Sequence, residues 1–121
     1  MATILVADDN QPTRELANHI LSAEGHNVLQ AVDGGSAIKV INEHKIDCII
    51  VDQYMPDDSG FNVAKHVKAN GFEVPMVLIT GHMASDLLFE AQKAGFVRIL
   101  SKPFQAEDLL KTVKAVLRIS S

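Results

Sequence analysis

The sequence predicts an α/β protein built on one doubly wound sheet of five parallel strands. Short apolar runs alternate along the chain with stretches of helical periodicity. The apolar runs are continuous, which is typical of strands buried on both faces of a parallel sheet. The length of 121 residues fits a single domain spanning 1–121. Strict alternation of strands and helices implies right-handed crossovers, with helices on both faces of the sheet.

The first strand is predicted at Thr3–Ala7, a continuous apolar run rich in β-branched residues. The second and the last apolar runs are weaker than the others, and Arg98 interrupts the last. The four later runs are, in chain order, Val28–Val32, Asp47–Val51, Val74–Ile79 and Phe96–Leu100.

Helices are predicted between these runs, where apolar residues recur at three- and four-residue spacing. In chain order, the five apolar faces contain Leu16, Ala17, Ile20 and Leu21; Ala37, Ile38 and Ile41; Val63, Ala64 and Val67; Leu87, Leu88, Ala91 and Ala94; and Leu109, Leu110, Val113, Val116 and Leu117. Glycines expected at helix C-termini are Gly25, Gly71 and Gly95. Turn signals before the second and third helices are Gly34-Gly35 and Asp58-Ser59-Gly60.

Five strands suit the flavodoxin-like strand order 2-1-3-4-5. In this order the first and third strands are neighbours at the point where the winding reverses. Ligands of such sheets bind outside the carboxyl ends of the strands at that point. The residues that follow the first and third strands are therefore the first candidates for a functional site.

Composition excludes several classes of protein. The net charge is −4 with scattered basic residues, which argues against a surface for nucleic acid or anionic membranes. No apolar run reaches the ~18 residues of a membrane span, and the first residues lack the basic region of a secretory signal. The single cysteine, Cys48, allows no internal disulfide and is expected to be a small buried hydrophobe. A cytoplasmic location is expected.

Polar side chains stand at the carboxyl ends of four predicted strands. Asp8 and Asp9 follow the first strand, Asp52 ends the third, Thr80 ends the fourth and Lys102 follows the fifth. Three carboxylates close together repel one another and favour a bound cation, and hard oxygen ligands favour Mg²⁺. Carboxylates, a metal, a lysine and a hydroxyl together are suited to a phosphoryl group.

These residues lie in motifs that resemble the receiver domain of two-component response regulators. The resemblance extends from Ile4 to Leu117, and its motifs occur in the expected order at matching strand ends. The motifs are Val6-Ala7-Asp8-Asp9-Asn10, Val51-Asp52-Gln53-Tyr54-Met55-Pro56 followed by Gly60, Ile79-Thr80-Gly81, and Ser101-Lys102-Pro103-Phe104.

The resemblance implies a role for each acidic residue. Asp52 matches the phosphoacceptor, which takes a phosphoryl group from a histidine kinase or a phosphotransfer protein. Asp9, Asp52 and the backbone carbonyl of Tyr54 match direct Mg²⁺ ligands. Asp8 matches the acid that holds the metal, partly through water.

The resemblance also implies a switch. Thr80 matches the hydroxyl that moves to the acyl phosphate, and Lys102 matches the lysine that pairs with a phosphoryl oxygen. The bond between Lys102 and Pro103 matches one that is usually cis in the family. Phosphorylation would shift the surface of the fourth helix, fifth strand and fifth helix, where Phe89 is a candidate partner contact. Expected partners are a downstream protein or an output domain. An activation-dependent dimer is also expected.

Three positions depart from the commoner family pattern. Ile99 stands where a switch aromatic usually lies, so a switch of altered amplitude or partner surface is expected. Tyr54 and His82 occupy the two positions that flank the phosphoryl group and tune its hydrolysis. Both side chains are bulky enough to screen attacking water, which predicts a long phosphorylated lifetime. The competing hypothesis is that His82 assists water as a base.

The predicted function is that of a phosphorylation-controlled switch, and not of an enzyme. A receiver-like module that works without phosphorylation is one alternative, which Ile99 favours. A small Mg²⁺-dependent phosphatase of the haloacid dehalogenase type is another, but it requires an acid two residues after the nucleophile, where Tyr54 stands. A flavodoxin would require a phosphate loop where Asp8 and Asp9 stand.

Overall fold

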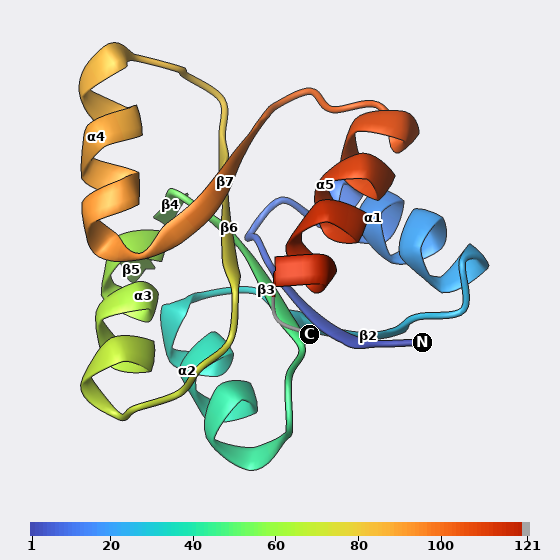
Figure 1. Cartoon of the computed structure of the whole chain (residues 1–121), viewed down its shortest axis with the longest axis horizontal. Coiled ribbons are helices and arrows are strands. Elements are labelled where there is room, and N and C mark those ends of the chain that lie inside the picture. The colour runs from blue at the N-terminus through green and yellow to red at the C-terminus, as the bar shows by residue number, and fades with distance from the viewer. Residues whose placement is uncertain (120–121) are drawn as a thin grey trace.

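The computed structural model describes residues 1–119 and shows a central sheet between two layers of helices (Figure 1). The predicted domain boundary at residue 121 lies outside the described residues. The helices are α1 (Gln11–Ala23), α2 (Gly34–Glu43), α3 (Gly60–Ala69), α4 (Ser85–Ala94) and α5 (Ala106–Ile119). The strands are β1 (Thr3–Ala7), β2 (Asn27–Ala31), β3 (Cys48–Asp52), β4 (Tyr54–Met55), β5 (Asp58–Ser59), β6 (Met76–Thr80) and β7 (Phe96–Ser101).

The main sheet has the order β2-β1-β3-β6-β7, and all its neighbouring strands are parallel. Counted among these five strands alone, this is the predicted order 2-1-3-4-5. The sequence did not predict β4 and β5, which pair antiparallel as a two-residue ribbon after β3. Strands two residues long carry no periodicity from which they could be recognised.

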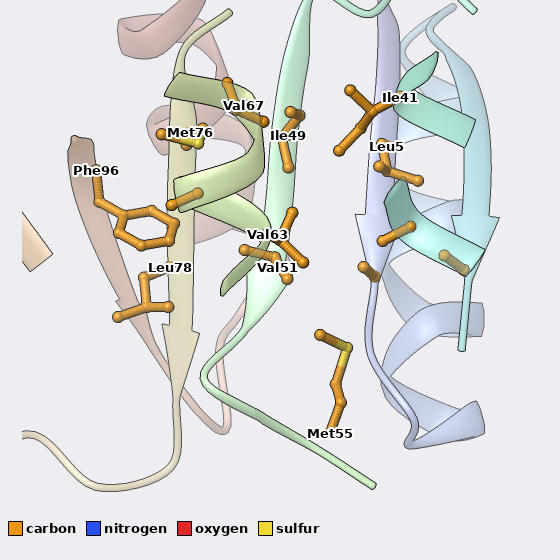
Figure 2. Close-up of a cluster of buried hydrophobic side chains, with 14 of the residues drawn as sticks. Leu5, Ile41, Ile49, Val51, Met55, Val63, Val67, Met76, Leu78 and Phe96 are labelled. Carbon is orange, nitrogen blue, oxygen red and sulfur yellow. The ribbon is translucent and has the colours of Figure 1, made fainter. Parts of the chain in front are cut away.

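Two apolar cores cover the two faces of the sheet. On one face, strand residues such as Leu5, Ile49 and Leu78, labelled in Figure 2, belong to one core with residues of α2, α3 and α4. On the other face, the alternate strand residues pack against α1 and α5. Since successive strand residues point to opposite faces, two buried faces require the continuous apolar runs seen in the sequence. Packing on both faces holds the strands, and therefore their carboxyl ends, in fixed positions relative to one another.

The central strand β3 is buried at all five of its residues. Cys48 begins this strand, is fully buried and belongs to the core beneath α1 and α5, as the sequence predicted. Burial and the nearby Asp47 raise the pKa of its thiol to about 12.

The ends of the helices follow the sequence signals except at the starts of α2 and α3. The predicted turn Asp58-Ser59-Gly60 forms strand β5 and the first residue of α3. Gly25, Gly71 and Gly95 have positive φ angles of 88°, 72° and 106° just beyond α1, α3 and α4, as expected of C-terminal glycines. The Gly34-Gly35 pair was wrongly interpreted as a turn, because both residues lie in the first turn of α2. Asp33 caps that helix and accepts a hydrogen bond from the Ser36 backbone.

Two leucines assigned to apolar helix faces are exposed. Leu16 on α1 is 46% exposed and Leu88 on α4 is 52% exposed. Helix α4 packs at the edge of the sheet against β7 and α3. A narrow apolar stripe containing Leu87 and Ala91 makes this contact, and the rest of the helix faces solvent. Within the described residues, no helix is long and apolar enough to cross a membrane.

Candidate functional site

Three carboxylates meet where β1 and β3 end side by side. Asp8 and Asp9 follow β1, and Asp52 is the last residue of β3. One oxygen of each carboxylate lies within 4.8 Å of the others. Asp8 and Asp52 are buried, whereas Asp9 is exposed. The parallel topology therefore brings together the acidic residues that the sequence singled out, and leaves the cluster open to solvent on one side.

Lys102 supplies the positive charge beside these carboxylates. Its Nζ lies 2.8 Å from Oδ2 of Asp8 and 3.3 Å from Oδ2 of Asp52. Asp8 also accepts a hydrogen bond from the Asn10 backbone through Oδ1, at 2.9 Å. The buried Oδ2 of Asp8 has no hydrogen bond of favourable angle among the described residues. The ammonium of Lys102 is therefore its electrostatic partner.

The crowding of charge shifts two pKa values. Burial, and then the charge of Asp8, raise the pKa of Asp52 to about 6, although Lys102 opposes this. Burial would lower the pKa of Lys102, but its pairing with Asp8, and then with Asp52, outweighs burial and raises that pKa. One lysine does not fully compensate three carboxylates, so the site favours a further cation.

The residues present fit Mg²⁺. The donors are hard carboxylate oxygens, which this ion prefers, and Oδ2 of Asp8 lacks a well-aligned hydrogen bond. The exposed Asp9 leaves a path for entry and room for the water ligands that Mg²⁺ usually keeps. The backbone of Tyr54 follows Asp52 by two residues, at the start of the β4–β5 ribbon.

We expect Asp52→Asn to stabilise the metal-free protein at pH 7 by about 1–2 kcal/mol. The pKa of Asp52 rises from 3.8 to about 6 on folding, so the folded state binds more protons between these values. Stability therefore falls as pH rises from about 4 to about 6, and the amide that replaces the carboxylate does not titrate. Urea denaturation at pH 4 and pH 7 measures the difference. An equal gain at both pH values, or none, would contradict this electrostatic account, and Asp86→Asn, at an exposed carboxylate of α4, is the control.

Thr80 ends β6 next to this cluster and is 1% exposed. Its hydroxyl lies 2.8 Å from Oε1 of Gln53 and accepts a hydrogen bond from the His82 backbone at 3.1 Å. The Lys102 backbone donates to the Thr80 carbonyl at 2.7 Å, which joins the two strand ends. Sequence reasoning assigned no role to Gln53. The available signal was that Gln53 is a polar residue directly after β3, and that β3 neighbours β6, the strand that ends at Thr80.

The other predicted site residues lie outside the acidic cluster. Ile99 is partly buried and packs against the core beneath α2, α3 and α4. The Tyr54 side chain is 71% exposed, and His82 is exposed. The bond between Lys102 and Pro103 is cis, as the sequence predicted. The side chains of Ile99 and Tyr54 therefore do not join the acidic cluster.

The loop after β3 is held by contacts that the sequence did not predict. The Asp57 carboxylate accepts hydrogen bonds from the backbone N–H groups of Gly34 and Gly35 at 3.0 and 3.3 Å. Gly60 donates its N–H to the Gln53 carbonyl at 3.0 Å. These bonds tie the β4–β5 ribbon to the start of α2 and to the end of β3.

The chain matches the family model described as the response regulator receiver domain over residues 4–114. It is 32% identical over 118 residues to the response regulator MprA of Mycobacterium sp. strain KMS, covering 98% of this chain and 51% of that protein. The chain thus spans about half the length of the curated relatives it matches.

Solved structures agree with this match. The chemotaxis response regulator CheY4 of Vibrio cholerae has a TM-score of 0.91 and 32% identity, covering 96% of this chain and 98% of that one. The receiver domain of the Francisella response regulator 1452 has a TM-score of 0.94 at 24% identity and covers all of both chains, which supports the fold. The chain therefore belongs to the response regulator receiver domain family.

Proposed function

We propose that this protein is a phosphorylation-controlled switch in which Asp52 accepts a phosphoryl group, with Mg²⁺ as cofactor, from a histidine kinase or phosphotransfer protein. Receiver domains are signalling switches of two-component systems and not classical enzymes. The observation that carries the proposal is the cluster of Asp8, Asp9 and Asp52 beside Lys102. A cytoplasmic location, where a lone thiol stays reduced, is part of the same proposal.

The chemistry follows from the charges around Asp52. A carboxylate oxygen of Asp52 attacks phosphorus, the P–O bond forms, and the bond to the donor's imidazole nitrogen breaks. Asp9, Asp52 and the Tyr54 backbone carbonyl would hold Mg²⁺, with Asp8 partly through water, and the ion would neutralise charge on the phosphoryl oxygens. Lys102, 3.3 Å from Asp52, moves with the new anion and pairs with one of its oxygens.

The new anion then biases the outer surface of the domain. Thr80 turns its hydroxyl toward the phosphoryl group, and its strand β6 lies beside β7. The surface formed by α4, β7 and α5 shifts toward its active conformation. In that conformation it engages a downstream protein, an output domain or a second copy. Phe89 on α4 is 69% exposed there. Ile99, in place of a switch aromatic, contributes less movement than a ring would.

The proposal includes a long lifetime of the phosphorylated state. Tyr54 and His82 follow Asp52 and Thr80 by two residues each and are both exposed, so a turn of either side chain would cover a phosphoryl group. Loss of label after removal of the donor measures this lifetime. Rapid loss that Tyr54→Ala and His82→Ala leave unchanged would contradict screening by these residues, and slower loss in His82→Ala would favour the base mechanism.

Acetyl phosphate with Mg²⁺ should add one phosphoryl group to the wild-type chain and none to Asp52→Asn, as measured by intact mass after an acid quench. Chelation of the metal should abolish the addition. Asp86→Asn, an exposed carboxylate on α4, is the matched control and should react like the wild type.

Failure of the wild type to gain mass would be followed by a beryllofluoride titration with Mg²⁺. Binding that requires Asp52 would show a phosphoryl group lost faster than the quench. Absence of binding would overturn the proposal and favour a receiver that works without phosphorylation. An adduct that persists in Asp52→Asn would place the chemistry at another residue.

A further inference from the structure

Gln53 holds the hydroxyl of Thr80 in the unphosphorylated chain. The Thr80 hydroxyl donates to Oε1 of Gln53 at 2.8 Å, with the His82 carbonyl as a second acceptor at 3.1 Å. The same hydroxyl oxygen accepts from the His82 N–H at 3.1 Å. A hydroxyl has one hydrogen to donate, so this proton is already committed before any anion reaches Asp52.

The backbone of Gln53 fixes the position from which its side chain reaches Thr80. Its N–H donates to the Ile79 carbonyl at 2.9 Å, and its carbonyl accepts from the Gly60 N–H at 3.0 Å. The side chain is half-buried, and its Nε2 donates to the Tyr54 hydroxyl at 3.4 Å. Two backbone hydrogen bonds therefore fix where the side chain of Gln53 starts, and its amide contacts Tyr54 through Nε2 and Thr80 through Oε1.

We propose that Gln53 is a positioning residue that restrains the switch by competing with the phosphoryl group for the hydroxyl proton of Thr80. The inference rests on the proposed function, because it assigns a regulator to the same site. In the unmodified chain the bond to Gln53 stabilises the resting position of Thr80. When Asp52 carries a phosphoryl group, Thr80 must exchange the Gln53 oxygen for a phosphoryl oxygen.

Gln53→Met tests the restraint, since methionine has the same length but lacks the amide acceptor. Beryllofluoride with Mg²⁺ is the probe, and the fluorescence of Tyr54, the single tyrosine in a chain without tryptophan, reports binding. Loss of one neutral hydrogen bond from the resting state should tighten beryllofluoride binding about three- to tenfold. Gln30→Met, at an exposed residue of edge strand β2, is the control and should leave the affinity unchanged.

Thr80→Val distinguishes positioning from a general structural effect. In that background Gln53→Met should give no further gain, because no hydroxyl remains to be released. Gln53→Asn, whose amide is one methylene shorter, should tighten binding in the same direction as Gln53→Met. Thermal unfolding establishes that each variant is folded.

Equal or weaker binding in folded Gln53→Met would overturn the restraint while leaving the proposed function intact. A gain that persists in Thr80→Val would also overturn it. A wild-type chain that takes neither beryllofluoride nor a phosphoryl group would overturn the proposed function and the restraint together.

Discussion

Lys102→Met should lower the free energy of unfolding of the metal-free protein by about 3 kcal/mol at pH 7. Lys102 is 2.8 Å from the fully buried Asp8 and 3.3 Å from Asp52, so its loss leaves two buried carboxylates beside Asp9 without the lysine that pairs with both. Methionine retains the apolar length of the side chain. Urea denaturation in the presence of a chelator measures the loss.

The electrostatic origin of this loss has two signatures. Mg²⁺ should restore much of the stability, because it neutralises the same carboxylates. Lowering the pH to 5 should also reduce the loss, because the pKa of Asp52 is already about 6 and removal of Lys102 raises it further. Lys111→Met is the control, since its pair with Glu107 is 76% exposed on both sides and should matter little. Equal losses in the two variants would contradict the account.

Gly60→Ala should destabilise the protein by about 2–3 kcal/mol and slow phosphorylation. A Cβ added at Gly60 would lie 2.7 Å from the Asp52 carbonyl oxygen and 3.1 Å from Cδ1 of Leu78. The first neighbour is backbone at the end of β3, so relief of the clash displaces the phosphoacceptor itself. Denaturation and the rate of reaction with acetyl phosphate measure the two effects.

Gly35→Ala is the matched control, because it also lies in the first turn of a helix. The nearest atom to its added Cβ is Oδ2 of Asp57 at 3.6 Å, an ordinary contact. This variant should gain about 0.5 kcal/mol from the smaller entropy of the unfolded chain. A Gly60→Ala protein as stable as Gly35→Ala would show that the end of β3 yields without strain.

The sequence was sufficient to predict the sheet and the acidic cluster. Burial on both faces produces continuous apolar runs, and parallel topology places the ends of those runs on one rim. The positions of Asp8, Asp52 and Thr80 at or just beyond strand ends therefore predicted their proximity without any knowledge of side-chain conformation. The structure confirms this grouping and adds the ion pairs to Lys102.

What the sequence could not predict depends on contacts between distant segments. Gly34 and Gly35 resemble a turn in the sequence, which does not show that their backbone N–H groups donate to Asp57, a carboxylate from a loop more than twenty residues away. The bond between Gln53 and Thr80 depends on which way an amide points at the end of β3. The exposure of Leu88 follows from the position of α4 at the sheet edge, which the helix's own periodicity does not encode.

The burial of Cys48 makes its thiol a probe of how often the sheet opens. The thiol lies at the start of the central strand with none of its surface exposed, and burial raises its pKa to about 12. Alkylating reagents attack the thiolate, so reaction requires that β3 first separate from the helices that cover it. Because Cys48 is the single cysteine, the rate at which chains are modified reports how readily the sheet opens at β3, without denaturant and in the presence of any ligand chosen.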